Sequence, residues 1–370
     1  MNITNMKKIK VLIVDDSSVI RSILTEIISS DPALEVVGEA KDPYVAREQI
    51  KKLNPDVITL DVEMPKMDGI TFLSNLMRLR PMPVIMLSTL TTKGADITLE
   101  ALELGAIDFI AKPSFEVLLA NRYAFKDALL DKLKSAVTVD QKSYQLSSAI
   151  SSAKQTKQAE QSTLAFAGCK RANHLVAIGS STGGTDALRQ VITQLPVNCP
   201  PVVIAQHIPV KFSERFATRL NSHVAVTVQE ARHGQKLKEG NVYIAPGDQH
   251  LQVVLKNGSL FSVLEDSEPV NRHKPSVDVL FDSLMPIASN TQALLLTGMG
   301  QDGAAGMAKL KKHGARTLIQ NKASSLIWGM PGAAHALNAH TSEHSLTDIA
   351  QELLAYAALS REQMKEVING

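Results

Sequence analysis

The sequence contains little that would place the protein outside a reducing compartment. Only two of its 370 residues are cysteines, Cys169 and Cys199, and they form no Cys-x-x-Cys pair, which argues against a disulfide framework. The apolar run that follows the N-terminus, Val11–Val14, is too short for the core of a secretory signal peptide. No predominantly apolar run approaches the roughly 20 residues that span a bilayer. We therefore expect a cytoplasmic protein without membrane insertion.

The sequence also lacks a strong charge of either sign. Its formal net charge is +2, so a general electrostatic grip on nucleic acid is not indicated. Hydrophobic residues make up 44% and charged residues 21%, which is typical of a soluble globular protein. The length alone suggests two or three domains.

Two long stretches alternate between β-branched runs and helix-like segments. Residues 8–137 and 174–358 both show this alternation, which predicts parallel sheets covered by helices. Between them, Gln141–Thr163 is rich in Ser and Gln without a strong apolar period, so we expect residues 138–173 to be a flexible linker. In the second stretch, Asn257-Gly258 between two apolar runs predicts a β-hairpin. The expected fold is a doubly wound (βα)5 domain followed by an α/β parallel-sheet domain with a β-hairpin insertion.

Charged and hydroxyl side chains follow the predicted strands of the first domain. Asp15-Asp16 follow the first strand, Asp61 ends the third, Ser88 ends the fourth and Lys112 follows the fifth. Carboxyl ends of parallel strands meet at one edge of a sheet. There, carboxylates suit a hard divalent cation, one of them can attack phosphorus, and a lysine and a hydroxyl can bind phosphoryl oxygens. Taken singly, each residue has an ordinary explanation, such as Asp16 or Ser17 capping a helix; the agreement of four strand ends favours a site.

Four motifs in this stretch, "VLIVDDS", "LDVEMPKMDG", "VIMLS" and "IAKP", resemble those of response-regulator receiver domains. The resemblance implies that a histidine kinase phosphorylates Asp61. It also implies a Mg²⁺ site formed by Asp15, Asp16, Asp61 and the backbone carbonyl of Glu63. Further implied roles are phosphoryl contacts by Ser88 and Lys112, and a switch role for the aromatic Phe109.

In the second domain, "VAIGSSTGGTDA" from Val176 to Ala187 reads as a strand, a Gly-rich turn and the start of a helix. It fits G-x-S-x-G, a turn that exposes the central serine, and the pattern selects Ser181 rather than Ser180. The alternative is a small-residue helix N-terminus that binds an anion or nothing. The stretch is neither a Walker loop nor a G-x-G-x-x-G fingerprint.

A nucleophilic serine needs a base and an acid that orients it. The next strand, "PVVIAQH", ends in His207, and Asp302 lies in the Gly-rich turn after the strand "ALLLTGMG". Alone, His207 is more often structural and Asp302 a helix cap. Together with Ser181 they place Ser, His and Asp at one edge of one sheet, in an order that disfavours the α/β-hydrolase fold. Candidate oxyanion-hole donors are the backbone N–H groups near Thr182, Met299 and Gly300, and the sequence does not choose between them.

Six motifs of this domain resemble the chemotaxis protein-glutamate methylesterase (CheB) family: "AIGSSTGGT", "QHIP", "YIAPGDQH", "HKPSVDVLF", "LTGMGQDGAAGM" and "GMPGAA". The resemblance implies hydrolysis of glutamate γ-methyl esters on methyl-accepting chemotaxis receptors, releasing methanol, and deamidation of certain receptor glutamines. It assigns the triad to Ser181, His207 and Asp302, without a cofactor in the catalytic domain. Two departures are Lys322, where an acidic residue is expected, and a long linker.

A second class of function stays open at this point. The chain could be a non-catalytic, receiver-regulated protein that binds a partner. A DNA-binding version would show a basic recognition helix and a shorter output domain, and the sequence has neither.

Overall fold

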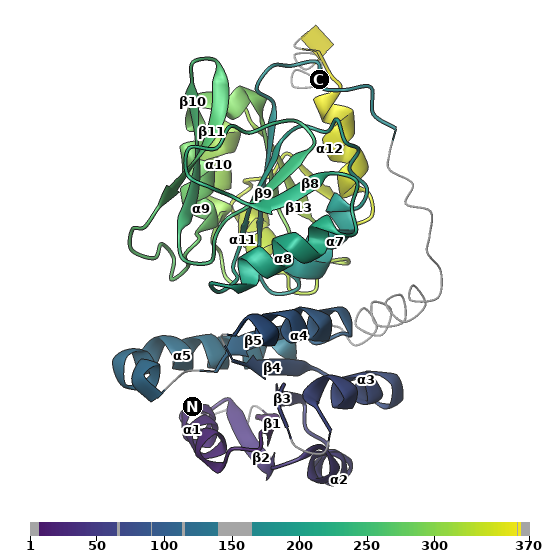
Figure 1. The fold of residues 1–370 in the computed structure, drawn as a ribbon, viewed down its shortest axis with the longest axis vertical. Coiled ribbons are helices and arrows are strands. Elements are labelled where there is room, and N and C mark those ends of the chain that lie inside the picture. Colours follow the sequence, from purple (N-terminus) through teal and green to yellow (C-terminus); the bar gives the residue numbers. More distant parts are fainter. Residues whose placement is uncertain are drawn as a thin grey trace, which may run out of the picture. The chain divides into compact units, whose positions relative to one another are not determined.

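The computed structural model describes residues 7–64, 67–89, 91–112, 115–139, 165–360 and 362–363. These residues form two compact units, one before residue 140 and one after residue 164, and each is considered by itself (Figure 1). Among the described residues, no helix is both long enough and apolar enough to cross a membrane.

The first unit is a five-stranded parallel sheet in the order β2-β1-β3-β4-β5, the doubly wound arrangement that the sequence predicts. Its central strands are buried because helices cover the sheet, which is why they are rich in Val, Ile and Leu. The strands are β1 (Ile9–Val14), β2 (Leu34–Ala40), β3 (Val57–Asp61), β4 (Val84–Ser88) and β5 (Asp108–Ala111). The helices are α1 (Ser18–Ser29), α2 (Pro43–Leu53), α3 (Gly69–Leu79), α4 (Thr92–Glu103) and α5 (Phe115–Ala136).

Short polar side chains begin the helices of this unit. The Ser17 hydroxyl caps α1 by accepting a hydrogen bond from the Ile20 N–H, and Asp68 caps α3 through the Thr71 N–H. The capping explanation therefore holds for Ser17, and it does not account for Asp16.

The second unit is built on a seven-stranded sheet in the order β14-β13-β12-β6-β7-β9-β8, in which every neighbouring pair is parallel. Helices α9 and α10 lie on one side of this sheet and α7, α8 and α12 on the other (Figure 1). The strands of the sheet are β6 (Leu175–Ser180), β7 (Val202–Gln206), β8 (Thr227–Glu230), β9 (Asn241–Ile244), β12 (Thr291–Leu295), β13 (Arg316–Gln320) and β14 (Ser342–His344). The helices are α7 (Gly184–Ile192), α8 (Phe212–Asn221), α9 (Val277–Ser283), α10 (Ala304–Lys312), α11 (Met330–Ala336) and α12 (Ile349–Ala357), with a 3₁₀ turn at Met285–Asn290.

The predicted hairpin is confirmed. Strands β10 (His250–Lys256) and β11 (Ser259–Glu265) pair in an antiparallel register, and Asn257 and Gly258 both adopt positive φ at the turn. The sequence patterns do not predict two strands of the main sheet, β9 and β14. Strand β9 is only four residues long, and β14 is a three-residue polar edge strand, so neither carries a detectable period.

Strand β6 is the point at which the order of strands along the sheet reverses. The chain runs from β6 to β7 on one side, and later returns to place β12 on the other side. Ligand sites of open parallel sheets form at such a switch point, beyond the carboxyl ends of the strands. The motifs around Ser181, His207 and Asp302 all follow strands at this point.

The expected linker, residues 138–173, lies mostly outside the described residues. Its described C-terminal part, residues 165–173, belongs to the second unit: the Asn198 side chain donates to the Phe166 carbonyl, and Arg171 Nη2 donates to the Tyr356 carbonyl at 3.1 Å. The domain boundaries at 137 and 174 stay a prediction.

Candidate active site and phosphorylation site

The turn after β6 is compact enough to require glycine. Gly183, the N-cap residue of α7, has a φ of +76°, and a Cβ built there would lie 2.8 Å from the Leu326 side chain. A Cβ on Gly184 would lie 2.3 Å from the Gln206 side-chain oxygen. The sequence therefore folds into the sharp strand-to-helix turn that the G-x-S-x-G pattern predicts.

The two neighbouring serines lie in different surroundings. Ser180 is fully buried, and its hydroxyl donates a 2.6 Å hydrogen bond to Gln206 Oε1. Ser181 is half-buried, and its backbone N–H donates to the Thr297 carbonyl at 3.1 Å. Ser180 thus belongs to the core beneath the turn, whereas the Ser181 side chain lies at the surface of the sheet edge.

His207 and Asp302 form a close pair. Ser180 and Gln206 are register partners on β6 and β7, so Ser181 and His207 follow paired positions. His207 Nε2 lies 2.9 Å from Asp302 Oδ2. The other ring nitrogen, Nδ1, is buried and makes no hydrogen bond to any described residue, Ser181 included. The structure therefore brings His207 and Asp302 together and leaves the second ring nitrogen available to a proton donor.

Asp302 is a nearly inaccessible carboxylate held by several donors. It accepts hydrogen bonds from the Asn271 amide and the Ser276 hydroxyl, both at 2.8 Å, and from the Val277 N–H at 2.7 Å. Burial alone would raise the pKa of Asp302, but the hydrogen bond and charge of His207, together with these donors, hold it well below its usual value. Asp302 is thus fixed as an anion, and it does not cap α10, whose N-cap residue is Gly303 and which has no side-chain cap.

Sequence reasoning missed several residues that contact the His207–Asp302 pair, among them Asn271, His273 and Ser276. Asn271 and Arg272, with φ values of +53° and +67°, form a tight turn in which the backbones of Val270 and His273 bond to each other. The turn carries Asn271 to Asp302. It also stacks the His273 ring on His207, with centroids 3.6 Å apart and planes at 8°. The signal for His273 was available, because it begins the quoted motif "HKPSVDVLF"; nothing in the sequence predicts Arg272 at positive φ.

The oxyanion-hole candidates lie on two loops beside Ser181. Thr182 follows it directly, and the Thr297 hydroxyl donates to the Thr182 carbonyl at 3.0 Å. Met299 and Gly300 follow Gly298, where a built Cβ would lie 2.9 Å from Ser181 Cβ. The Ser181 N–H is not a candidate because it donates to the Thr297 carbonyl, and Thr182, Met299 and Gly300 stay the predicted donors.

The first unit gathers its predicted acidic residues at the carboxyl ends of β1 and β3. Asp15, Asp16 and Asp61 each offer an oxygen, and these atoms all lie within 4.8 Å of one another. Lys112 Nζ lies 2.7 Å from both Asp15 Oδ2 and Asp61 Oδ2. Burial raises the pKa of Asp61 to about 6, although the Lys112 ammonium opposes this shift. The backbone N–H of Glu63 donates to Asp61 Oδ1 at 3.2 Å.

The remaining predicted receiver residues are buried nearby. The Ser88 hydroxyl donates to the Gly94 carbonyl at 3.2 Å, and no hydrogen bond between Ser88 and Asp61 occurs in the described part of the chain. Phe109 is buried on β5. In the second unit, Lys322 is exposed in the turn that the hydrogen bond from the Ser324 N–H to Asn321 Oδ1 closes.

Comparison with known proteins now identifies both units. Residues 176–353 match the CheB methylesterase family, and residues 11–123 match the response regulator receiver domain. A protein-glutamate methylesterase/protein-glutamine glutaminase 1 from Xanthomonas campestris pv. campestris is 48% identical over 356 residues, covering 95% of this chain and 98% of that protein. The chain belongs to the CheB methylesterase family.

A second curated relative agrees with the first in length and name, and a solved structure matches the second unit alone. A protein-glutamate methylesterase/protein-glutamine glutaminase 2 from Saccharophagus degradans is 47% identical over 95% of this chain and 99% of its own length. The crystal structure of the Thermotoga maritima CheB methylesterase catalytic domain is 38% identical, covering 50% of this chain and 98% of that one with a TM-score of 0.49. The two family matches and the full-length relatives confirm the prediction of a receiver followed by a methylesterase domain, and the non-catalytic alternative loses its basis.

Proposed function

We propose that this chain is a phosphorylation-activated protein-glutamate methylesterase in which Ser181 is the nucleophile, His207 the base and Asp302 its orienting acid. Family membership gives the class of reaction. The observation that carries the residue assignment is the 2.9 Å contact between His207 and the buried Asp302. Ser181, which is only half-buried, follows the strand position that pairs with the residue before His207. Three strand ends of one sheet supply these groups at its switch point.

The contacts of His207 indicate a different role for each of its two ring nitrogens. Since Nε2 donates to Asp302, Nδ1 is the nitrogen that accepts a proton. Ser181 Oγ attacks the carbonyl carbon of a glutamate γ-methyl ester while its proton passes to His207 Nδ1. The bond to the methoxy group then breaks, and His207 returns the proton so that methanol leaves. Water repeats the sequence on the acyl-serine, which regenerates Ser181 and leaves glutamate.

Asp302 stabilises the imidazolium that forms when His207 takes the proton. Its low pKa keeps it ionised throughout. The carbonyl oxygen becomes negative in the same step, and backbone N–H groups near Thr182, Met299 or Gly300 would stabilise it. The helix α7 that begins beside Ser181 adds a favourable dipole. An amide substrate would follow the same path with ammonia leaving, which is the expected deamidation of receptor glutamines.

The receiver controls the esterase through Asp61. Its carboxylate is the nucleophile for phosphoryl transfer from a chemotaxis histidine kinase. Lys112, already bound to Asp61, would hold the phosphoryl oxygens. Phosphorylation adds nearly two negative charges beside Lys112, and movement of Ser88 and Phe109 would carry the change to the surface of the unit.

The residues around Asp61 fit a magnesium ion. Asp15, Asp16 and Asp61 offer hard oxygen ligands within 4.8 Å of one another, and the Glu63 carbonyl would complete the protein's share. When bound, the ion neutralises the repulsion between carboxylates and incoming phosphate. The catalytic unit needs no cofactor for this chemistry. The substrates are methyl-accepting chemotaxis receptors, which the enzyme reaches from the cytoplasm, with no role for nucleic acid or membrane insertion.

Methanol release from methylated receptor tests this function. We expect a low initial rate for the unmodified chain and a higher rate with Mg²⁺ and a small-molecule phosphodonor. Asp61→Ala should keep the low rate and lose the stimulation. A chain that releases no methanol under either condition would contradict the proposed esterase, whereas equal stimulation of Asp61→Ala would contradict only the assignment of the phosphorylation site.

A further inference from the structure

A group of metal-ligating side chains lies away from Ser181 and takes no part in the reaction above. His335 stands in the last turn of α11, His340 in the loop that follows, and Glu343 on the edge strand β14. One ligand atom from each lies within 4.8 Å of the other two. The two imidazoles are nearly parallel, at 18° with centroids 5.0 Å apart, and His335 Nε2 lies 4.0 Å from Glu343 Oε2.

The backbone that carries these side chains is firmly held. Asn338 ends α11 in the left-handed conformation with a φ of +50°, and the Ala339 N–H donates back to the Ala334 carbonyl at 2.8 Å. Lys311 Nζ donates to the carbonyls of both Asn338 and His340, each at 2.8 Å. His340 is thus fixed in place, while the side chains of His335 and Glu343 are 56% and 34% exposed and can rotate.

Two imidazoles and a carboxylate match the ligands of a divalent transition metal ion such as Zn²⁺, with water completing the coordination. Ligand atoms on a tetrahedral ion are roughly 3.3 Å apart for bonds of about 2.0–2.1 Å. The three side chains must therefore approach by up to about 1.5 Å from the separation of 4.8 Å, which rotation of His335 and Glu343 can supply. The Lys311 ammonium opposes a cation here, and the Glu343 carboxylate offsets it.

A surface ion pair between His335 and Glu343 is the simpler explanation for why these three side chains lie together, but it accounts for the arrangement poorly. At 4.0 Å and this exposure, the His335–Glu343 contact contributes little by itself. That pair also involves only two of the three side chains, and it leaves the His340 ring, nearly parallel to His335, without an explanation.

We propose that His335, His340 and Glu343 form a binding site for a divalent transition metal ion that joins the end of α11 to β14. The site is structural. The other end of α11 lies beside the catalytic turn, because the Gly329 and Met330 N–H groups both donate to the Gly298 carbonyl. A bound ion holds this helix between the sheet edge and the Gly298 loop and raises the thermal stability of the catalytic unit.

The fluorescence of Trp328 can report metal binding at this site. Trp328 is its single tryptophan, and the Trp328 and His335 rings lie 6.3 Å apart between centroids. Ni²⁺ quenches tryptophan fluorescence at short range, whereas Zn²⁺ has a filled d shell and competes without quenching. Titration of the full-length, EDTA-treated chain with Ni²⁺ should give saturable quenching, reversed by Zn²⁺, and Zn²⁺ should raise the melting temperature.

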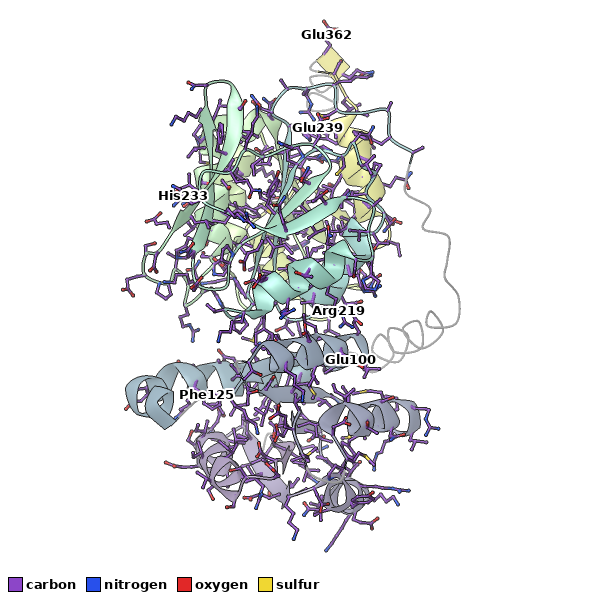
Figure 2. The ribbon with its side chains drawn as sticks, in the orientation of Figure 1. Glu100, Phe125, Arg219, His233, Glu239 and Glu362 are labelled. Atoms are coloured by element: carbon purple, nitrogen blue, oxygen red, sulfur yellow. The ribbon has the colours of Figure 1, made fainter. Side chains whose placement is uncertain are left out.

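The variants Glu343→Gln and His340→Ala should each weaken Ni²⁺ binding by about tenfold or more and abolish the Zn²⁺-induced rise in melting temperature. His233→Ala is the matched control, since His233 is an exposed histidine that bonds to Leu264 on β11 (Figure 2). Without metal, the melting temperature of each variant shows whether it folds. Quenching that is absent in the wild type, or unchanged in folded Glu343→Gln and His340→Ala, would overturn the proposal.

Discussion

Asn271 offers the sharpest test of how the structure positions the catalytic pair. Its amide Nδ2 lies 2.7 Å from Asp278 Oδ2 and 2.8 Å from Asp302 Oδ1, so one side chain steadies two neighbouring carboxylates. Asn271→Gly removes this donor and keeps the backbone unstrained, because glycine adopts the φ of +53° found here. We expect slower catalysis in a chain that still folds.

The expected loss in kcat follows from the hydrogen bonds that Asp302 keeps when Asn271 is replaced. A hydrogen bond to a charged group contributes about 1.5–3 kcal/mol, and about 1.4 kcal/mol corresponds to a tenfold change in rate. Asp302 keeps the Ser276 hydroxyl and the Val277 N–H as donors. The loss should therefore lie near the lower end of that energy range, which corresponds to a fall of about tenfold in kcat for methanol release. KM should change little because Asn271 acts through Asp302.

Asn257→Gly is the control for the backbone. Asn257 has a similar φ of +49° but lies in the β10–β11 turn, so its replacement should leave kcat unchanged. Asn271→Asp makes the test stricter, since a third carboxylate would stand beside Asp278 and Asp302 and should slow the reaction more than glycine does. A kcat for Asn271→Gly equal to that of Asn257→Gly would refute the positioning role.

Two further predictions concern Asp61 and Gly298. The folded pKa of Asp61, about 6, exceeds its ordinary 3.8, so the stability this group contributes is present below pH 3.8 and is lost as the pH rises through about 6. In metal-free buffer, Asp61→Asn should therefore melt higher than the wild type above pH 6, with the difference closing towards pH 3.8; a constant difference in thermal melts would contradict the raised pKa. Gly298→Ala would place a Cβ 2.9 Å from Ser181 Cβ and 2.4 Å from Met330 Sδ, so kcat should fall and the melting temperature with it; an unchanged kcat would show that this loop does not position Ser181.

The sequence predicted the features that depend on local pattern. Alternating apolar runs gave both parallel sheets, and Asn257-Gly258 gave the hairpin, because a two-residue turn with positive φ needs those residue types. Asp15, Asp61, Ser181 and His207 could be placed at the carboxyl edges of their sheets because each follows or ends a predicted strand, and parallel strands bring their carboxyl ends to one edge. These arguments need only the order of elements along the chain.

Features that depend on tertiary contacts were out of reach. The hydrogen bond that buries Ser180 against Gln206 joins two strands, and only register reveals it. The stack of His273 on His207 needs a turn in which Arg272 adopts positive φ, which propensity disfavours and the surrounding contacts impose. Strand β14 has no period to detect, since it is a three-residue edge strand.

The central claim is that Ser181, and not its neighbour, attacks the ester. The most direct measurement is the initial rate of methanol release from methylated receptor by Ser181→Ala and Ser180→Ala, each with Mg²⁺ and a phosphodonor. Ser181→Ala should lose roughly a thousandfold or more, since a nucleophile works as one unit with its base. Ser180→Ala loses one buried hydrogen bond, which costs about 1 kcal/mol of stability, and should keep most of the rate. An inactive Ser180→Ala that remains folded, beside an active Ser181→Ala, would contradict the account.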